Sequence, residues 1–145
     1  IYYIMNFKIM EDVAISEAAF EAFGKNEAEL FENAAIALFE LMVDTSAIEP
    51  KTKVQIRLSA ASLDELLFKW LSELIFVKDA QEIVFGSFKT EIKKEKEFLL
   101  NAHCFGEPIK YPDKRLRNDV KAVTKHLFEV KEEKGKFKAT VVIDI

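Results

Sequence analysis

The sequence has little cysteine, glycine or proline, with 1, 4 and 3 of these residues among 145. A single cysteine excludes an internal disulfide and favours a reducing, cytoplasmic location. We interpret Cys104 as a core strand residue, with a catalytic thiol as the weaker alternative. There is no low-complexity linker and no glycine-rich phosphate loop. We therefore expect one domain spanning residues 1–145.

Long hydrophobic runs and a basic surplus are also missing. Charges interrupt every apolar stretch before it reaches membrane-spanning length, and residues 1–4 are too short a run for a signal peptide. We expect these four residues, which precede Met5, to come from the expression vector or an upstream start, or to be disordered. The net charge of -4 argues against strong direct binding of nucleic acid. Protein or metal partners fit this composition better.

Two helices are predicted from their start signals. Half of the residues are hydrophobic and 13 are Phe, which is enough for a substantial core. Asn26 with Glu29, and Ser62 with Glu65, form two capping boxes, so helices should begin at residues 27 and 63. The first should end near residue 42. The second carries apolar residues at helical spacing, and we expect its Trp70 to lie in the core.

Strands are predicted where apolar and polar residues alternate with a period of two. These segments are 7–10, 15–23, 54–58, 83–92, 98–105, 120–130 and 137–145. The last two should form one long β-hairpin. A polar connector with three cations, residues 111–118, is expected to be a flexible loop. The order predicts an α+β, two-layer domain in which two amphipathic helices pack on one face of a mostly antiparallel sheet.

Recognisable catalytic motifs are absent. There is no nucleophile elbow, no His-Glu-x-x-His and no Cys-x-x-Cys. The two histidines, His103 and His126, do not have the spacing of a zinc site. Because His126 is in phase with Thr124 and Phe128, we expect a hydrogen-bonded, partly buried imidazole rather than a general base.

The remaining candidate for chemistry is a group of carboxylates. Glu17 is predicted on the polar face of its strand, and Asp144 alternates with Ile143 and Ile145. If these strands are neighbours, Glu17, Asp144 and the C-terminal carboxylate of Ile145 would form an all-oxygen pocket of the kind that Ca²⁺ or Mg²⁺ selects. The alternative is that they are ordinary surface carboxylates. Lys121 is either a solvated strand residue or a partner for the carboxylates or a phosphate.

Seven segments contain more specific sequence motifs. They are Phe-Glu-Ala-Phe-Gly at 20–24, Phe-Glu-Asn-Ala-Ala at 31–35, Leu-Met-Val-Asp-Thr at 41–45, the helical stretch 66–76, Gly-Glu at 106–107, Asp-Val-Lys-Ala-Val-Thr-Lys-His at 119–126 and Val-Val-Ile-Asp-Ile at 141–145. Together they resemble the archease family over residues 7–145. The resemblance implies a protein cofactor that activates an RtcB-type RNA ligase in tRNA splicing, promoting its guanylylation and multiple turnover.

The resemblance also implies a divalent-metal site, seen in the family with calcium. Its ligands include the Asp of a His-Thr-Ala-Asp stretch and the Asp before the C-terminal residue, and a Lys in a Val-Lys-Ala stretch matters to function. By position these are Glu17, which replaces the first Asp, then Asp144 and Lys121. Ala14 stands where the family has His. The longer glutamate moves the oxygens by about 1.5 Å, and a small shift in alignment would promote Asp12, which we rank second.

Two other functions remain open. The first is a chaperone-like modulator of a tRNA-modifying enzyme such as a tRNA methyltransferase, a role also suggested for archeases. It would bind through apolar or charged faces with little dependence on Glu17 and Asp144. The second is a metal-dependent hydrolase, against which the lack of a positioned base or nucleophile weighs.

Overall fold

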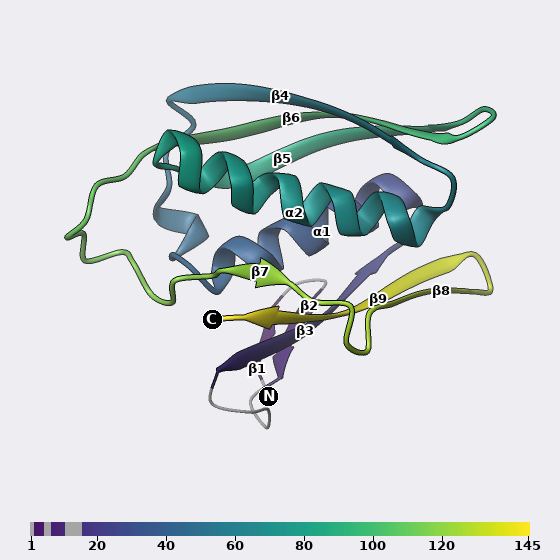
Figure 1. The fold of residues 1–145 in the computed structure, drawn as a ribbon, viewed down its shortest axis with the longest axis horizontal. Helices are drawn as coiled ribbons and strands as arrows, with labels where there is room; N and C mark the ends of the chain where they lie inside the picture. The colour runs from purple at the N-terminus through teal and green to yellow at the C-terminus, as the bar shows by residue number, and fades with distance from the viewer. Residues whose placement is uncertain (1, 5–6, 11–15) are drawn as a thin grey trace.

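Two helices lie between two β-sheets. The computed structural model describes residues 2–4, 7–10 and 16–145. The elements are β1 (Tyr2–Ile4), β2 (Phe7–Met10), β3 (Glu17–Gly24), α1 (Glu27–Glu40), the short 3-10 helix η1 (Thr45–Ala47), β4 (Thr52–Ala60), α2 (Leu63–Gln81), β5 (Ile83–Lys94), β6 (Phe98–Pro108), β7 (Ala122–Val123), β8 (Glu129–Glu133) and β9 (Lys136–Asp144). Figure 1 shows α1 and α2 with β4, β5 and β6 on one side and the remaining strands on the other.

Both sheets are antiparallel. The larger has the order β1-β2-β3-β9-β7, and β8 also pairs with β9. The smaller has the order β4-β6-β5, with a bulge at Gly86. The predicted α+β class, with two helices packed on antiparallel strands, is confirmed. The structure adds that the strands form two sheets, so that the helix pair is covered from both sides.

Both helices begin where their capping boxes predict. The Asn26 side chain accepts the Glu29 N–H at 2.8 Å, and the Glu29 carboxylate accepts the Lys25 N–H at 3.1 Å. The Ser62 hydroxyl accepts the Glu65 N–H at 3.4 Å. These bonds satisfy donors that the first turn of a helix leaves without partners. In the described part of the chain, neither helix combines the length and apolar character needed to cross a bilayer.

The core between the sheets contains the predicted residues Trp70 and Cys104. Trp70 is fully buried, and its indole N–H donates to the Phe31 carbonyl of α1 at 3.0 Å. Its ring meets Phe88 edge-on, with centroids 5.9 Å apart. Cys104 is fully buried on β6, and this burial raises the pKa of its thiol to about 12. The thiol therefore stays protonated at neutral pH, as a core residue would.

The C-terminal hairpin differs from its prediction. A continuous strand over residues 120–130 is wrong, because a turn separates β7 from β8. Leu127 in this turn has φ of 55°, in the left-handed region that interrupts a strand. Phe128 packs edge-on against Phe68 of α2, with centroids 5.4 Å apart. His126 is exposed in the same turn, so the partly buried imidazole is wrong as well.

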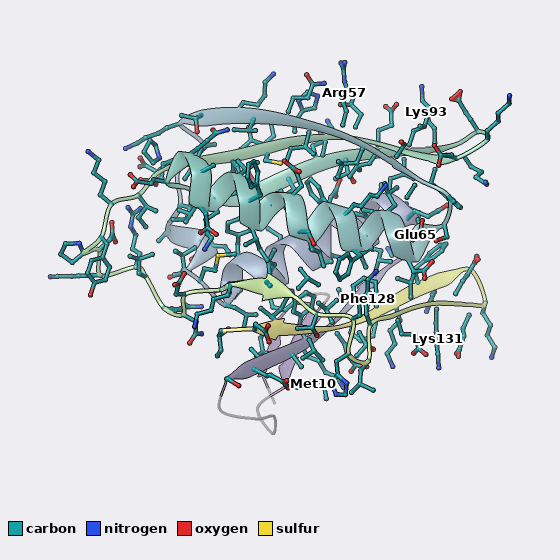
Figure 2. The ribbon with its side chains drawn as sticks, viewed as in Figure 1. Met10, Arg57, Glu65, Lys93, Phe128 and Lys131 are labelled. Carbon is teal, nitrogen blue, oxygen red and sulfur yellow. The ribbon has the colours of Figure 1, made fainter. Side chains whose placement is uncertain are left out.

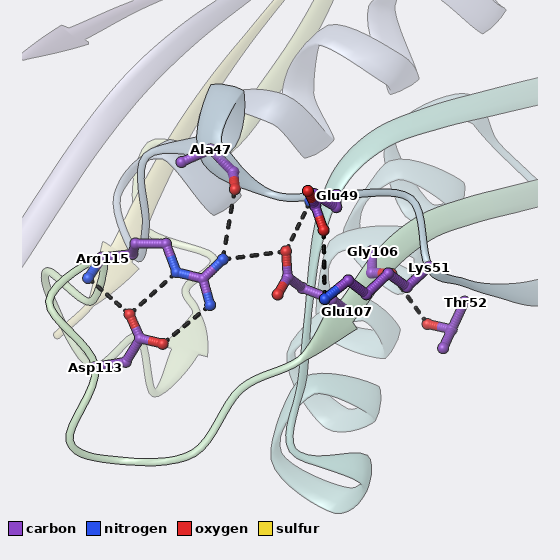
Figure 3. Close-up of polar contacts among 8 residues, drawn as sticks. All are labelled: Ala47, Glu49, Lys51, Thr52, Gly106, Glu107, Asp113 and Arg115. Carbon is purple, nitrogen blue, oxygen red and sulfur yellow. Dashed lines mark hydrogen bonds and ion pairs between the residues drawn. The ribbon is translucent and has the colours of Figure 1, made fainter.

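Two buried carboxylates bind arginines of the connector between β6 and β7, residues 111–118. The Arg117 guanidinium donates to the Glu40 carboxylate at 2.8 Å and to the Glu40 carbonyl at 2.7 Å. The Arg115 guanidinium lies 3.0 Å from the Glu107 carboxylate and 2.9 Å from the Asp113 carboxylate (Figure 3). Glu40 and Glu107 are 9% and 6% exposed. Both arginines of the connector are thus paired within the fold.

Replacing Arg115 by Gln is expected to destabilise the protein more at neutral pH than in acid. Hydrogen bonds from Arg115 lower the pKa of Asp113 from 3.8 to about 2, and bonds from the Glu49 N–H and Arg115 lower the pKa of Glu107. A lowered carboxyl pKa stabilises the fold above the unfolded-state pKa, and this contribution is lost as the pH falls toward the folded-state pKa. Thermal unfolding should show a Tm gap at neutral pH that closes between about pH 4 and pH 2.

The matched control for this prediction is Lys114→Gln, which removes one exposed positive charge beside Arg115. Its Tm should follow that of the wild type at every pH, because surface substitutions away from a network have small effects. A Tm gap for Arg115→Gln that keeps its full size in acid would contradict the assignment.

Candidate functional site

Glu17 and Asp144 lie directly opposite each other on neighbouring strands. β3 pairs with β9 along its whole length, with Glu17 beside Asp144 and Ala18 beside Ile143. Directly paired residues carry their side chains on one face, with Cβ atoms about 4.5–5.5 Å apart. Ala18 and Ile143 are buried, whereas Asp144 is exposed and Glu17 half-buried. The two carboxylates therefore project from the face of the larger sheet that points away from the helices.

Backbone hydrogen bonds hold this end of β9 from both sides. The Ile145 N–H donates to the Ser16 carbonyl at 3.0 Å, and the Lys121 N–H donates to the Asp144 carbonyl at 2.8 Å. β7 then begins with Ala122 opposite Asp144. The structure thus brings Lys121, which is exposed, and Ile145 beside Asp144. Four of the residues predicted for the site come together at one corner of the larger sheet.

A second glutamate on the same face of β3 is balanced by lysines. Glu21 forms ion pairs with Lys8 and Lys138, each at 2.8 Å. Partial burial alone would raise the pKa of Glu21, but hydrogen bonds from Lys138 and Lys8 outweigh it and lower that pKa. Among the described residues, no ion pair involves Glu17 or Asp144. Like charges directly opposite destabilise a strand pair, so a bound cation would stabilise this one.

The donor chemistry of the pair fits a hard divalent cation. Ca²⁺ prefers carboxylate and carbonyl oxygens and takes about six to eight of them. Two carboxylates supply at most four, and the described residues contain no group of three or more His, Cys, Asp or Glu side chains arranged to hold a metal. Further ligands would be backbone carbonyls, water or the Ile145 carboxylate expected from the sequence. Asp12, the second candidate ligand, and Ala14 lie outside the described residues.

A cleft that the sequence did not indicate lies between the end of α2 and the connector. It has a volume of about 720 Å³, and its lining includes Lys78, Glu82, Val84, Ile109, Arg117 and Asp119. Lys78 pairs with Asp79 at 2.8 Å and donates to the Val120 carbonyl at 3.2 Å. The lining of the cleft therefore contains both cations and carboxylates. Because its walls come from a helix end and an aperiodic connector, no pattern in the sequence could have revealed it.

Comparison with known proteins assigns the chain to one family. The model of the Archease protein family matches residues 7–145. The chain belongs to the archease family. A protein archease from Methanothermobacter thermautotrophicus is 40% identical over 131 residues, which are 90% of this chain and 93% of that protein. A protein archease from Methanosarcina barkeri is 36% identical over 132 residues, covering 90% of each.

Solved structures support the archease fold. The solution structure of a Methanobacterium thermoautotrophicum protein matches with a TM-score of 0.85 and 38% identity, covering 97% of this chain and 99% of that one. A Thermotoga maritima crystal structure, described as an archease and possible chaperone, has a TM-score of 0.62 at 18% identity, covering 99% of this chain and 100% of that one. The second likeness concerns the fold alone. The archease resemblance noted in the sequence is confirmed.

Proposed function

We propose that this archease-family protein activates an RtcB-type RNA ligase in tRNA splicing, without catalysing ligation itself. Membership of the family supports a role as an accessory protein. The observation that carries the proposal is the pairing of Glu17 with Asp144, which leaves two carboxylates side by side at a sheet corner that a partner enzyme can reach. The ligase provides the nucleophile and the nucleotide pocket, and this protein acts on its guanylylation step.

In this proposal Glu17, Asp144 and the terminal carboxylate of Ile145 hold a divalent cation, most simply Ca²⁺. When bound, such an ion supplies positive charge that stabilises charge developing on a phosphoryl group. The β3–β9 pairing sets the spacing of the two carboxylates. The backbone bond from Lys121 to Asp144 keeps this lysine next to them, and its exposed ammonium provides a point charge for a nucleotide phosphate.

An add-back assay tests the proposal. The ligase is held at about a tenth of the concentration of tRNA halves, so that full ligation needs repeated turnover. We expect this protein to raise both the rate of ligase guanylylation and the number of turnovers per ligase. Equal product with and without the protein, at saturating GTP and Ca²⁺, would exclude ligase activation.

A chaperone-like action on a tRNA-modifying enzyme is the second candidate. It is favoured by two large apolar side chains at the surface, Phe76 on α2 and Leu127 in the turn before β8, which are 65% and 67% exposed. Exposed apolar groups of this kind suit transient contact with another protein. A tRNA methyltransferase retained by the wild type and by a Glu17→Gln variant, but lost with Phe76→Ser, would support this candidate.

A further inference from the structure

The outer face of the smaller sheet, on the side away from the helices, has an unusual composition. On the central strand β6, Ala102 and Cys104 are fully buried, and the residues that alternate with them point outward. These outward residues are Leu99, Asn101, His103 and Phe105. Neither Leu99 nor Phe105 belongs to the hydrophobic core or packs against it. The middle of this face thus presents an aromatic ring, an imidazole and an amide at its surface.

Basic side chains flank these four outward residues of β6, which we call the central strip, on both sides. Lys53 and Arg57 on β4 are exposed, as are Lys89 and Lys93 on β5. The opposite side of β5 faces the helices, since the Thr90 hydroxyl donates to a carbonyl of α1 at 2.9 Å. Figure 2 shows Arg57 and Lys93 projecting outward from the smaller sheet.

The strand register interleaves these groups. Phe105 lies beside Lys53, and His103 lies between Gln55 and Lys89. Asn101 lies between Arg57 and the one exposed carboxylate of these three strands on this face, Glu91. Glu91 is 3.5 Å from Lys93, so its charge is partly balanced. The face is therefore basic, although the whole chain carries a net charge of -4.

Polar groups between the cations provide hydrogen bonds. The Gln55 amide donates to the Asn101 carbonyl oxygen at 2.8 Å, which leaves the Gln55 oxygen and the Asn101 amino group for a ligand. Nδ1 of His103 is the one buried side-chain nitrogen or oxygen in the described residues without a hydrogen-bond partner in the protein. Beside them a shallow hollow of about 490 Å³ is lined in part by Arg57, Lys93 and Leu99.

We propose that this outer face, centred on His103 and Phe105, binds a short single-stranded nucleic acid. Bases stack on aromatic side chains presented by the central strands of a sheet, while flanking cations contact the phosphates. An acidic protein surface would use the cations but would leave the ring and the amides of the central strip without a role. Residues on one face of a strand are spaced by about 6.6 Å. The four outward residues of β6 therefore accommodate about four nucleotides.

The net charge predicts that nucleic acid is not bound strongly, and the proposed site agrees with weak, short binding. Few phosphates are contacted, so Kd should lie on the order of 10–100 µM at physiological salt. The inference is independent of the proposed ligase activation. The carboxylate pair belongs to the other sheet, and either test can fail without the other.

Fluorescence anisotropy with labelled eight-nucleotide oligouridylate and oligothymidylate, free of divalent metal, tests the site. We expect the wild type to bind. The K53Q/R57Q/K89Q variant should bind more weakly and should reduce the slope of log K against log salt by about 2. Phe105→Ala should weaken binding by roughly tenfold with an unchanged salt slope, which a purely electrostatic contact would not give. A preference for the RNA probe over the DNA probe would indicate contacts to the 2′-hydroxyl.

The matched control is K131Q/K134Q/K136Q, which removes the same charge from the exposed β8–β9 hairpin and should bind like the wild type. Equal loss in both triple variants would overturn the proposal, as would no binding of either probe at millimolar protein. Changes in the backbone amide chemical shifts of ¹⁵N-labelled wild type, when the oligonucleotide probe is added, give a second measurement. Shifts concentrated on β4, β5 and β6 support the site, and shifts confined to the larger sheet overturn it.

Discussion

With limiting ligase, the Asp144→Ala variant is expected to leave RNA ligation at the level of the ligase alone. Asp144 supplies one of the two paired carboxylates, and its backbone carbonyl also anchors Lys121. Removal of the Asp144 carboxylate leaves only the Glu17 side chain and so halves the number of side-chain oxygens available to a cation. Loss of a residue that only orients a metal ligand lowers metal affinity by roughly 10- to 100-fold. Loss of a ligand should lower the affinity at least as much. The measurement is product formed per ligase over many turnovers.

Two further substitutions separate metal binding from strand packing. Asp144→Asn keeps the shape and removes the charge, so it should fail like alanine. Glu17→Asp shortens the side chain and introduces the residue type that the archease resemblance implies at this position, so we propose that it retains activity. The charge-matched control is Glu132→Ala, an exposed carboxylate on β8 that should behave as wild type. Wild-type turnover by Asp144→Asn would contradict the proposed role of the carboxylate pair.

The same variants predict a binding signal that needs no ligase. Millimolar Ca²⁺ should raise the Tm of the wild type, because a ligand that binds only the folded state stabilises it by mass action. The Tm of Asp144→Asn should not respond to Ca²⁺. It should also exceed that of the metal-free wild type, since removing one of two opposed negative charges relieves repulsion.

Trp70→Ala is expected to lower the free energy of unfolding by about 3–5 kcal/mol. The ring is fully buried between the sheets and contacts Phe88 of β5. Its truncation leaves a large cavity, and the Phe31 carbonyl loses the indole N–H. For a chain of this length the Tm should fall by roughly 10–16 °C. Urea unfolding followed by circular dichroism gives the free energy.

Two further variants separate the causes of that loss of stability. They are Trp70→Phe and Phe76→Ala. Trp70→Phe keeps most of the apolar volume but removes the N–H donor, so it should cost roughly 1–3 kcal/mol. Phe76 lies on the same helix and is 65% exposed, so its truncation should change stability by less than about 0.5 kcal/mol. A cost for Trp70→Ala no larger than that for Phe76→Ala would mean that the tryptophan does not hold the helices to the sheets.

Local patterns in the sequence predicted the elements that depend on neighbouring residues. Capping boxes mark both helix starts because the side chain and the backbone groups that it satisfies are three residues apart. Alternation marked β5 and β6, and the structure adds a bulge at Gly86. The prediction failed at residues 124–128, where alternation continues but Phe128 packs against α2 instead of extending the strand.

The amino-acid sequence was sufficient to predict the α+β class, the helix starts, the burial of Trp70 and Cys104, and the resemblance to archeases. Each depends on residue type and short-range periodicity. The folded arrangement was needed to learn that the strands form two sheets, that Glu17 pairs with Asp144, and that the lysines of β4 and β5 share one face. Pairing partners and register follow from how distant segments pack around α1 and α2, and alternation within a strand is the same whichever neighbour it has.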